Sequence, residues 1–433
     1  MFFDRITHSD PQKIALKYEG KQYTYAQILE ETTQRAKYFF EIQRSVLLNK
    51  PNPIENFLDF LACMYLGKKA IFITPTTPDL GLQAYKQRFD GVSSLDCKNA
   101  YLFDIQFFKS ISSDIFLGVL TSGTTGEPKV IWKDYQAWFS AFEYQSAVFG
   151  ISETDTVFVL DALAYSANLN AVLHALWQGC TVVLGKLSEA KYWQTHLENQ
   201  AVTSVFLVPS HLALFKNIVV KFDKVKSIVT AGEKLKQKVA KDISLYFPNA
   251  LITEYYGAAE LGHISYIQGN ELLENSHSVG RAFPGVSLKL LDNQIFVKSF
   301  YVSPDFRNKP TVSDLGEIGA DGLLYLLGRE GRMYNKRGLN IFAQEIENAA
   351  EEHPLVVTAY LVQNDSRESV LDLWVEYSAP LESADLRSFL SLKLSSDKLP
   401  NHIYCLAKLP RHSSGKINFK ALQKILSEEN IEA

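Results

Sequence analysis

The stretch Leu120-Thr121-Ser122-Gly123-Thr124-Thr125-Gly126-Glu127-Pro128-Lys129 decides how the rest of this chain is interpreted. It combines two glycines, four hydroxyl side chains within five residues, and a lysine. Glycines let backbone N–H groups approach an anion closely, hydroxyls donate further hydrogen bonds, and the lysine adds a positive charge. Together these residue types predict a loop that binds a polyphosphate.

The spacing of this loop differs from that of the Walker loop, in which Gly-Lys is followed by Ser or Thr at the start of a helix. Here Pro128 precedes the lysine, and residues 130–132 continue as an apolar strand. The apolar residues 115–120 predict a buried strand that leads into the loop. On composition alone, a polar hairpin without a ligand is the alternative.

The bulk composition indicates a globular protein with more than one domain. The chain has 433 residues, of which 46% are hydrophobic and 21% are charged, so it can form two or three domains with large cores. The net charge of −4 provides no polybasic face, and no nucleic-acid partner is expected. The four cysteines are scattered without metal-binding spacing, and no apolar run reaches the length of a membrane span. We therefore expect a cytoplasmic protein.

Strands and helices alternate along the chain as far as residue 256, which is typical of parallel α/β sheets. Residues 265–302 contain short strands and no expected helix, which predicts a small β-subdomain. From residue 328 onward, helices and strands mix in a region of about 100 residues, the size of a separate small domain. The expected fold class is α/β, with a large multi-subdomain N-terminal domain (1–328) and a mobile α+β C-terminal lid domain (329–433).

Local signals predict several element boundaries. Thr24 and Gln27 match a capping box, which predicts a helix to about Phe40. The aromatic-rich residues 135–149 predict one helix that Gly150 closes. Residues 81–113 have weak periodicity, and no elements are assigned there.

Residues 122–129 resemble the phosphate-loop signature of the adenylate-forming superfamily, which includes acyl-CoA synthetases, peptide-synthetase adenylation domains and luciferases. The resemblance implies that a carboxylate attacks the α-phosphorus of ATP, because AMP is a good leaving group and hydroxide is a poor one. It also implies Mg²⁺, and a second step in which the thiol of CoA or of a carrier-protein phosphopantetheine accepts the acyl group. Lys129 would be catalytic, and the ATP-binding residues of the loop would be Thr121, Ser122, Gly123, Thr124, Thr125 and Gly126.

Two further segments resemble superfamily motifs around the nucleotide. The segment Tyr256-Gly257-Ala258-Ala259-Glu260 is similar to Tyr-Gly-x-Thr-Glu, so Glu260 would hold Mg²⁺ while Tyr256 and Gly257 line the adenine side. Gly232-Glu233 resembles the segment that flanks the adenine. Ala259 stands where the family has a threonine that contacts the phosphate. The missing hydrogen bond keeps a catalytically impaired relative among the alternatives. Without the resemblance, each of these segments is an ordinary turn.

Motifs toward the C-terminus follow in the superfamily's order. Asp314 resembles the acid that accepts the ribose hydroxyls, and Arg329 resembles the arginine near ribose and phosphate. Gly331 stands at the hinge position, where the family usually has an acid or a lysine. Lys416, in the segment Pro410-Arg411-His412-Ser413-Ser414-Gly415-Lys416, matches the superfamily's catalytic lysine.

The loop before residue 343 resembles the segment that enters the active site for the thiol step, which assigns Arg337 and Gly338 to that step. Glu345 and Glu347 follow it and are expected to be helix-surface or structural acids.

The acid pocket is assigned to Tyr165 and Ser166. Amino-acid-activating relatives have an aspartate where alignment places Ser166, and it pairs with the substrate's α-ammonium. Asp161 lies five residues upstream and would substitute only if the loop folded back.

The sequence therefore predicts an AMP-forming acid–thiol ligase of the acyl-CoA synthetase type, most similar to compact succinylbenzoate- or fatty-acid–CoA ligases. Its substrate would be a fatty or aryl acid without an α-amine. The alternatives are an amino-acid-activating adenylation enzyme and a catalytically impaired nucleotide-binding relative.

Overall fold

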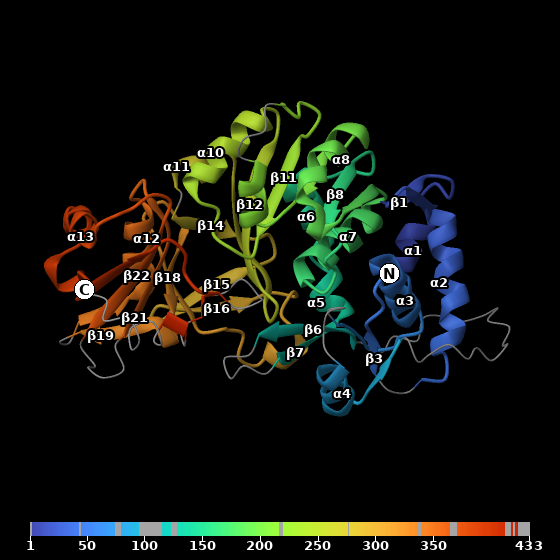
Figure 1. Cartoon of the computed structure of the whole chain (residues 1–433). Helices are drawn as coiled ribbons and strands as arrows, with labels where there is room; N and C mark the ends of the chain where they lie inside the picture. The colour runs from blue at the N-terminus through green and yellow to red at the C-terminus, as the bar shows by residue number, and fades with distance from the viewer. Residues whose placement is uncertain are drawn as a thin grey trace. The chain divides into compact units, whose positions relative to one another are not determined.

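The computed structural model of the chain consists of β-sheets and α-helices (Figure 1). The described residues are 2–42, 45–73, 79–94, 115–122, 128–215, 220–275, 277–336, 339–363, 370–411, 417–418 and 421–422. They form two compact units, the first made of residues 1–289 and 296–312 and the second of residues 290–295 and 313–433. The expected division into an N-terminal domain (1–328) and a mobile lid domain (329–433) stays a prediction.

One sheet of the first unit has five strands, in the order β5-β3-β4-β6-β7. Neighbouring strands are parallel except for β6 and β7, which form an antiparallel hairpin. The strands are β3 (Ser45–Leu48), β4 (Ala70–Phe72), β5 (Gly91–Ser93), β6 (Ile115–Ser122) and β7 (Pro128–Asp134). The hairpin confirms that the apolar run before the glycine-rich loop is a strand, and that the chain continues as a strand after it.

Helix α3 (Pro53–Tyr65) contacts β3, β4 and β6 of this sheet, and α4 (Asp79–Arg88) contacts β5. Helix α2 (Tyr25–Phe39) packs against α3 and α1 (Phe2–Thr7). The predicted capping box is present, because the Thr24 side chain accepts from the Gln27 backbone and the Gln27 side chain accepts from the Thr24 backbone. All of β5 and all but the first two residues of α4 lie within residues 81–113, where the periodicity is weak and no elements were assigned.

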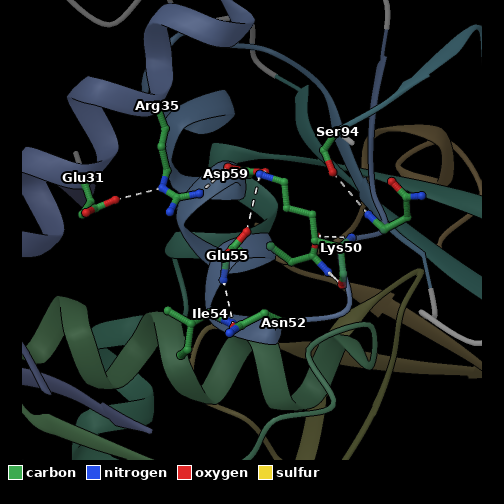
Figure 2. A network of polar contacts seen from close by, with 10 residues as sticks. Glu31, Arg35, Lys50, Asn52, Ile54, Glu55, Asp59 and Ser94 are labelled. Carbon is green, nitrogen blue, oxygen red and sulfur yellow. Dashed lines mark hydrogen bonds and ion pairs between the residues drawn. The ribbon is translucent and has the colours of Figure 1, made fainter. Parts of the chain in front are cut away.

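An ion-pair network joins α2 to α3 and to the loop that precedes α3 (Figure 2). Asp59 is almost fully buried, and its carboxylate accepts a hydrogen bond from Arg35 at 2.9 Å and forms an ion pair with Lys50 at 2.6 Å. Arg35 also pairs with Glu31 one turn earlier on α2. Because a buried carboxylate needs opposite charge, the network fixes α3 against α2.

The second sheet of this unit has the order β14-β13-β12-β11-β10-β8-β9-β1-β2. The strands β8 to β12 are parallel, whereas β13 pairs antiparallel with both β12 and β14. The strands are β1 (Ile14–Tyr18), β2 (Lys21–Thr24), β8 (Thr156–Leu160), β9 (Thr181–Gly185), β10 (Ser204–Phe206), β11 (Ser227–Ala231), β12 (Leu251–Ala258), β13 (Gly262–Gln268) and β14 (Ser278–Ala282). The β15–β16 hairpin (Ser287–Leu291 and Gln294–Lys298) follows.

The helices that accompany this sheet correct two expectations. The single helix predicted over residues 135–149 is two helices, because a turn at Ser140–Ala141 separates α5 from α6. A short helix, α11, also lies within residues 265–302, where none was expected. The helices are α5 (Tyr135–Phe139), α6 (Phe142–Phe149), α7 (Ser166–Gln178), α8 (Trp193–Asn199), α9 (Pro209–Leu212), α10 (Gln237–Tyr246) and α11 (Gly269–Glu274).

The second unit has its own apolar core, built from the helices and the three-stranded sheet of its C-terminal part. Its sheet has the order β21-β22-β23, and two hairpins precede it, β17–β18 and β19–β20. The elements are β17 (Asp314–Ile318), β18 (Leu324–Arg329), β19 (Met333–Lys336), β20 (Leu339–Phe342), α12 (Ala343–Glu351), β21 (Val356–Gln363), β22 (Leu371–Tyr377), α13 (Ser383–Ser391) and β23 (His402–Leu406). Across the described residues of both units, no helix is long and apolar enough to cross a membrane.

Candidate active site

Glu260 lies at the tip of the β12–β13 hairpin of the first unit. Residues Ala259 to Leu261 form the turn between the two strands. The hairpin closes tightly, because a Cβ on Gly257 would lie 2.5 Å from the carbonyl oxygen of Gly262. Gly262 has a φ of +72°, which favours glycine. The sequence therefore uses two glycines to present Glu260 at the end of a rigid ribbon.

The segment after β11 lies beside this hairpin. Strands β11 and β12 are parallel, and Ala231 at the end of β11 pairs with Tyr255 on β12. Gly232 follows with a φ of +90°, and the Glu233 carboxylate accepts a hydrogen bond from Ser210 Oγ at 3.3 Å. The structure therefore brings the Gly232–Glu233 segment close to Tyr256.

Tyr165 and Ser166 follow the carboxyl end of β8, which lies in the same parallel sheet. Ser166 is the first residue of α7, and Tyr165 is 62% exposed. Ligands of open α/β sheets bind at the carboxyl ends of the strands. These two residues thus lie at the sheet edge where a substrate is expected.

The two strands that flank the glycine-rich loop are described, whereas the loop itself is not. Thr121 pairs with Lys129 and Ser122 with Pro128 across the β6–β7 hairpin. The Thr121 hydroxyl donates to the Lys129 carbonyl at 3.4 Å. The predicted residues Gly123, Thr124, Thr125 and Gly126 lie outside the described residues, as do Arg337, Gly338 and Lys416.

Sequence reasoning missed Lys133, a lysine near the end of β7 that is only 2% exposed. Its ammonium lies 5.9 Å from the centre of the Trp138 ring. Burial lowers the pKa of Lys133 to about 8, while the Glu260 and Asp134 carboxylates act in the opposite direction. Alternation along β7 places Lys133 on the same face as Lys129, which is the only signal in the sequence that relates the two lysines.

Asp314 and Arg329, which belong to the second unit, form an ion pair of 2.8 Å. They face each other across the β17–β18 hairpin, where they are partners in the strand register. The Asp314 side chain is buried, whereas that of Arg329 is 66% exposed. The structure thus places the predicted ribose acceptor beside the predicted phosphate-side arginine.

The acids of α12 have structural partners. Glu347 is buried, and its carboxylate accepts from Arg332 and, at 2.6 Å, from the backbone N–H of Leu361. Glu345 pairs with Lys398 at 2.6 Å. Burial raises the pKa of Glu347, and Arg332 opposes that rise. These contacts agree with the expectation that the two acids are structural.

The donor set around Glu260 suits a cation that is bound largely by a nucleotide. Within the described ranges, no group of three or more His, Cys, Asp and Glu side chains could hold a metal ion. Mg²⁺ is commonly bound by one or two carboxylates together with substrate phosphates and water. A single carboxylate at the tip of a rigid hairpin fits that mode.

Comparisons with known proteins show which families and structures this chain resembles. The model of the family described as "AMP-binding enzyme" matches residues 108–296. The chain is 28% identical to an uncharacterized acyl-CoA ligase of Bacillus subtilis, YhfT, over 71% of this chain and 68% of the relative. It is 25% identical to VraA of Staphylococcus haemolyticus, named as a candidate long chain fatty acid-CoA ligase, over 96% of both chains.

Among solved structures, the chain resembles O-succinylbenzoate coenzyme A synthetase (MenE) from Bacillus subtilis in complex with ATP and magnesium ion. The TM-score is 0.83 and the identity 20%, with 98% of each chain covered. This likeness confirms the predicted α/β fold class with its smaller C-terminal domain. Residues 108–296 thus match the AMP-binding enzyme family, and the chain is similar to acyl-CoA ligases over most of its length.

Proposed function

We propose that this chain is an AMP-forming acid–thiol ligase that activates a fatty or aryl carboxylic acid and transfers it to CoA. The observation that carries the proposal is the Glu260 hairpin beside the Gly232 segment, in a chain that matches the AMP-binding family. The acyl-CoA ligase names of its relatives support the same enzyme class. A carrier-protein phosphopantetheine is the alternative acceptor, and the expected location is the cytoplasm.

Two steps account for the chemistry. In the first, a carboxylate oxygen of the acid bonds to the α-phosphorus of ATP, and pyrophosphate leaves. In the second, the thiol sulfur bonds to the acyl carbon of the acyl-adenylate, the thiol proton is lost, and AMP leaves. Charge neutralisation on the phosphates is the main demand of the first step.

The proposed residues supply this neutralisation from several elements. Lys129 is the second residue of β7, just after the phosphate loop, and Lys416 would add a second cation at the α-phosphate. Phosphate charge is neutralised further by Mg²⁺ when it is bound, and Glu260 would hold it together with the phosphates. Asp314 would accept the ribose hydroxyls, with Arg329 on the phosphate side.

The contacts of Asp161 support an acid without an α-amine. One oxygen of its carboxylate accepts from the Tyr18 hydroxyl at 3.0 Å and the other from the Leu187 backbone at 2.9 Å. The Asn168 side chain donates to the carbonyls of Leu160 and Ala162, which holds the Asp161 loop on α7. A substrate ammonium would lack a carboxylate partner at Ser166, and burying an unpaired charge is costly.

Five aromatic residues, Trp132, Trp138, Phe139, Phe142 and Tyr165, could help to line an apolar tunnel for the acid, but most of them belong to the core. Trp138 and Phe142 are buried in the main apolar cluster, and Phe139 packs against it. Trp132 packs against a smaller apolar cluster. Of the aromatic side chains considered, the exposed Tyr165 is the one available to a substrate.

A panel of acids tests the proposal. The purified chain is incubated with ATP, Mg²⁺ and either proteinogenic amino acids or medium-chain and aromatic acids, with and without CoA, and pyrophosphate release is measured. We expect the best fatty or aryl acid to exceed every amino acid, and mass spectrometry to detect its CoA thioester. An amino acid that outperforms all of them would overturn the substrate class, and no release with any acid would overturn the function.

A further inference from the structure

Residues 301–307 connect the two parts of the first unit that carry the candidate site. They follow β16, include a short 3-10 helix (Pro304–Phe306), and contact both the β12–β13 hairpin and β7. None of them belongs to a motif recognised in the sequence. Their contacts are specific at both ends of the segment.

At one end, the segment packs against the hairpin that carries Glu260. The buried Tyr301 lies against Gly262, where an added Cβ would be 2.6 Å from the Tyr301 Cβ. The Tyr301 hydroxyl donates to the Pro284 carbonyl at 2.5 Å. The hairpin and Tyr301 thus meet without space for a side chain at Gly262.

Ser303 continues this contact with two hydrogen bonds to the turn. Its backbone N–H donates to the Glu260 carbonyl at 2.9 Å, and its hydroxyl donates to the Ala259 carbonyl at 3.1 Å. Ser303 is fully buried, so water does not compete for these bonds. Both bonds are accepted by backbone carbonyls of the turn, so they fix the position of the backbone from which the Glu260 side chain extends.

At the other end, the segment contacts β7 at two points. The Lys129 ammonium lies 4.9 Å from the centre of the Phe306 ring. Arg307 donates to the buried Asp134 carboxylate at 2.6 Å, and Asp134 also caps α5 by accepting from Ala137 at 2.8 Å. The two points lie near opposite ends of β7, so the segment fixes this strand along its length.

The charge of Lys133 interacts with a carboxylate near each end of the segment. The Glu260 and Asp134 carboxylates both act on its buried ammonium and oppose the fall in its pKa. The segment anchors the Glu260 turn through hydrogen bonds to its backbone and Asp134 through its side chain, so both groups that it anchors act on the same cation. A displacement of the segment would change the spacing of Glu260 relative to Lys129.

We propose that residues 301–307, which we call the clasp, hold Glu260 at a fixed position relative to Lys129. Ser303 and Arg307 would then be positioning residues for binding of the magnesium–ATP complex. The inference rests on the proposed function for the roles of Glu260 and Lys129. Neither positioning residue contacts the nucleotide in this account. Their effect passes through the backbone of the Glu260 turn and through β7.

The test measures ATP affinity by calorimetry with Mg²⁺ and, separately, with EDTA. Arg307→Met removes a charge-assisted hydrogen bond and is expected to weaken ATP binding with Mg²⁺ by about tenfold. Ser303→Ala removes a neutral hydrogen bond and is expected to weaken it by a smaller factor. Binding with EDTA should change by less than about twofold, and Arg307→Lys should restore most of the affinity, because a cation again faces Asp134. The matched control is Arg281→Met, which removes an exposed arginine from its pair with Glu271 in the same unit.

The outcomes separate the clasp from the proposed function. The clasp proposal would be overturned if Arg307→Met and Ser303→Ala both left the affinity for ATP with Mg²⁺ unchanged. It would also be overturned if the variants lost equal affinity for ATP with Mg²⁺ and with EDTA. If the unaltered chain binds ATP with Mg²⁺ and the variants weaken it, the clasp stands even where no acid releases pyrophosphate. A chain that does not bind ATP with Mg²⁺ would overturn both.

Discussion

Asp155 is a buried carboxylate that joins three segments of the first unit. It accepts from the Ser152 backbone at 2.7 Å and hydroxyl at 2.9 Å, from the Thr203 hydroxyl at 2.7 Å, and from Lys226 at 2.9 Å. Burial alone would raise the pKa of Asp155, but these hydrogen bonds outweigh burial and lower it. The ionised form therefore stabilises the folded state.

Because the folded pKa is lower than the unfolded one, this stabilisation is present above pH of about 4 and is lost as pH falls through the folded pKa. We expect Asp155→Asn to lower the free energy of unfolding by about 2–3 kcal/mol at neutral pH. The deficit should shrink on acidification toward pH of about 3. Urea unfolding at both pH values checks this, with the exposed Asp223→Asn as control, and a deficit that does not depend on pH would contradict it.

Single residues also show which parts of the site can be read from a sequence. Glu260 and Lys129 belong to contiguous motifs, so their types and spacing were sufficient to select them. Ser303 and Arg307 act on segments far away along the chain, and neither lies in a local pattern. Lys133 was missed because burial, which distinguishes it from surface lysines, is a tertiary property.

At the scale of elements, the β12–β13 hairpin depends on the absence of a side chain at Gly262. A Cβ there would lie 2.9 Å from the backbone oxygen of Tyr301, and the φ of +72° adds backbone strain. We expect Gly262→Ala to cost about 2–4 kcal/mol of stability, from overpacking and the left-handed conformation together. Gly20→Ala is the matched control, because its φ is +76° but an added Cβ would meet nothing within 4 Å.

Thermal unfolding of the two variants separates steric crowding from backbone strain. The control should lose only about 1 kcal/mol, the cost of the left-handed conformation. Equal losses in both variants would show that the contact between Gly262 and Tyr301 contributes nothing.

Elements with strong local signals were predictable, and those decided by packing were not. The capping box at Thr24 correctly begins α2, because its hydrogen bonds are local. The break between α5 and α6 has neither glycine nor proline to mark it, and it was missed. The α11 helix has only six residues, too few for its periodicity to be recognised.

At the scale of the whole molecule, the fold class followed from the alternation of strands and helices, whereas the lid motion is a proposal. Asp314 and Arg329 belong to the second compact unit, while Glu260 and Lys129 belong to the first. The proposed chemistry requires residues of both units to act on one nucleotide. Glycine at the expected hinge, Gly331, suits such a pivot, because it tolerates a wide range of φ and ψ.

The lid proposal predicts that two substitutions affect different half-reactions. Lys416→Ala should slow acyl-adenylate formation by at least ~10²–10³, since it removes a full positive charge near the α-phosphate. Gly338→Leu should spare that step and slow thioester formation, because the side chain would obstruct the thiol. Pyrophosphate exchange and CoA-thioester formation are measured separately for each variant. Near-normal exchange in Lys416→Ala, or equal loss of both steps in Gly338→Leu, would argue against these roles.

The central claim, that the acid's own oxygen attacks the α-phosphorus of ATP, is tested most directly by isotope transfer. A fatty or aryl acid labelled with ¹⁸O in its carboxylate is incubated with the chain, ATP, Mg²⁺ and CoA, and the nucleotide product is analysed by mass spectrometry. The account predicts AMP that carries one ¹⁸O atom, because the bridging oxygen of the acyl-adenylate leaves with AMP. Unlabelled AMP, or ADP as the product, would contradict it.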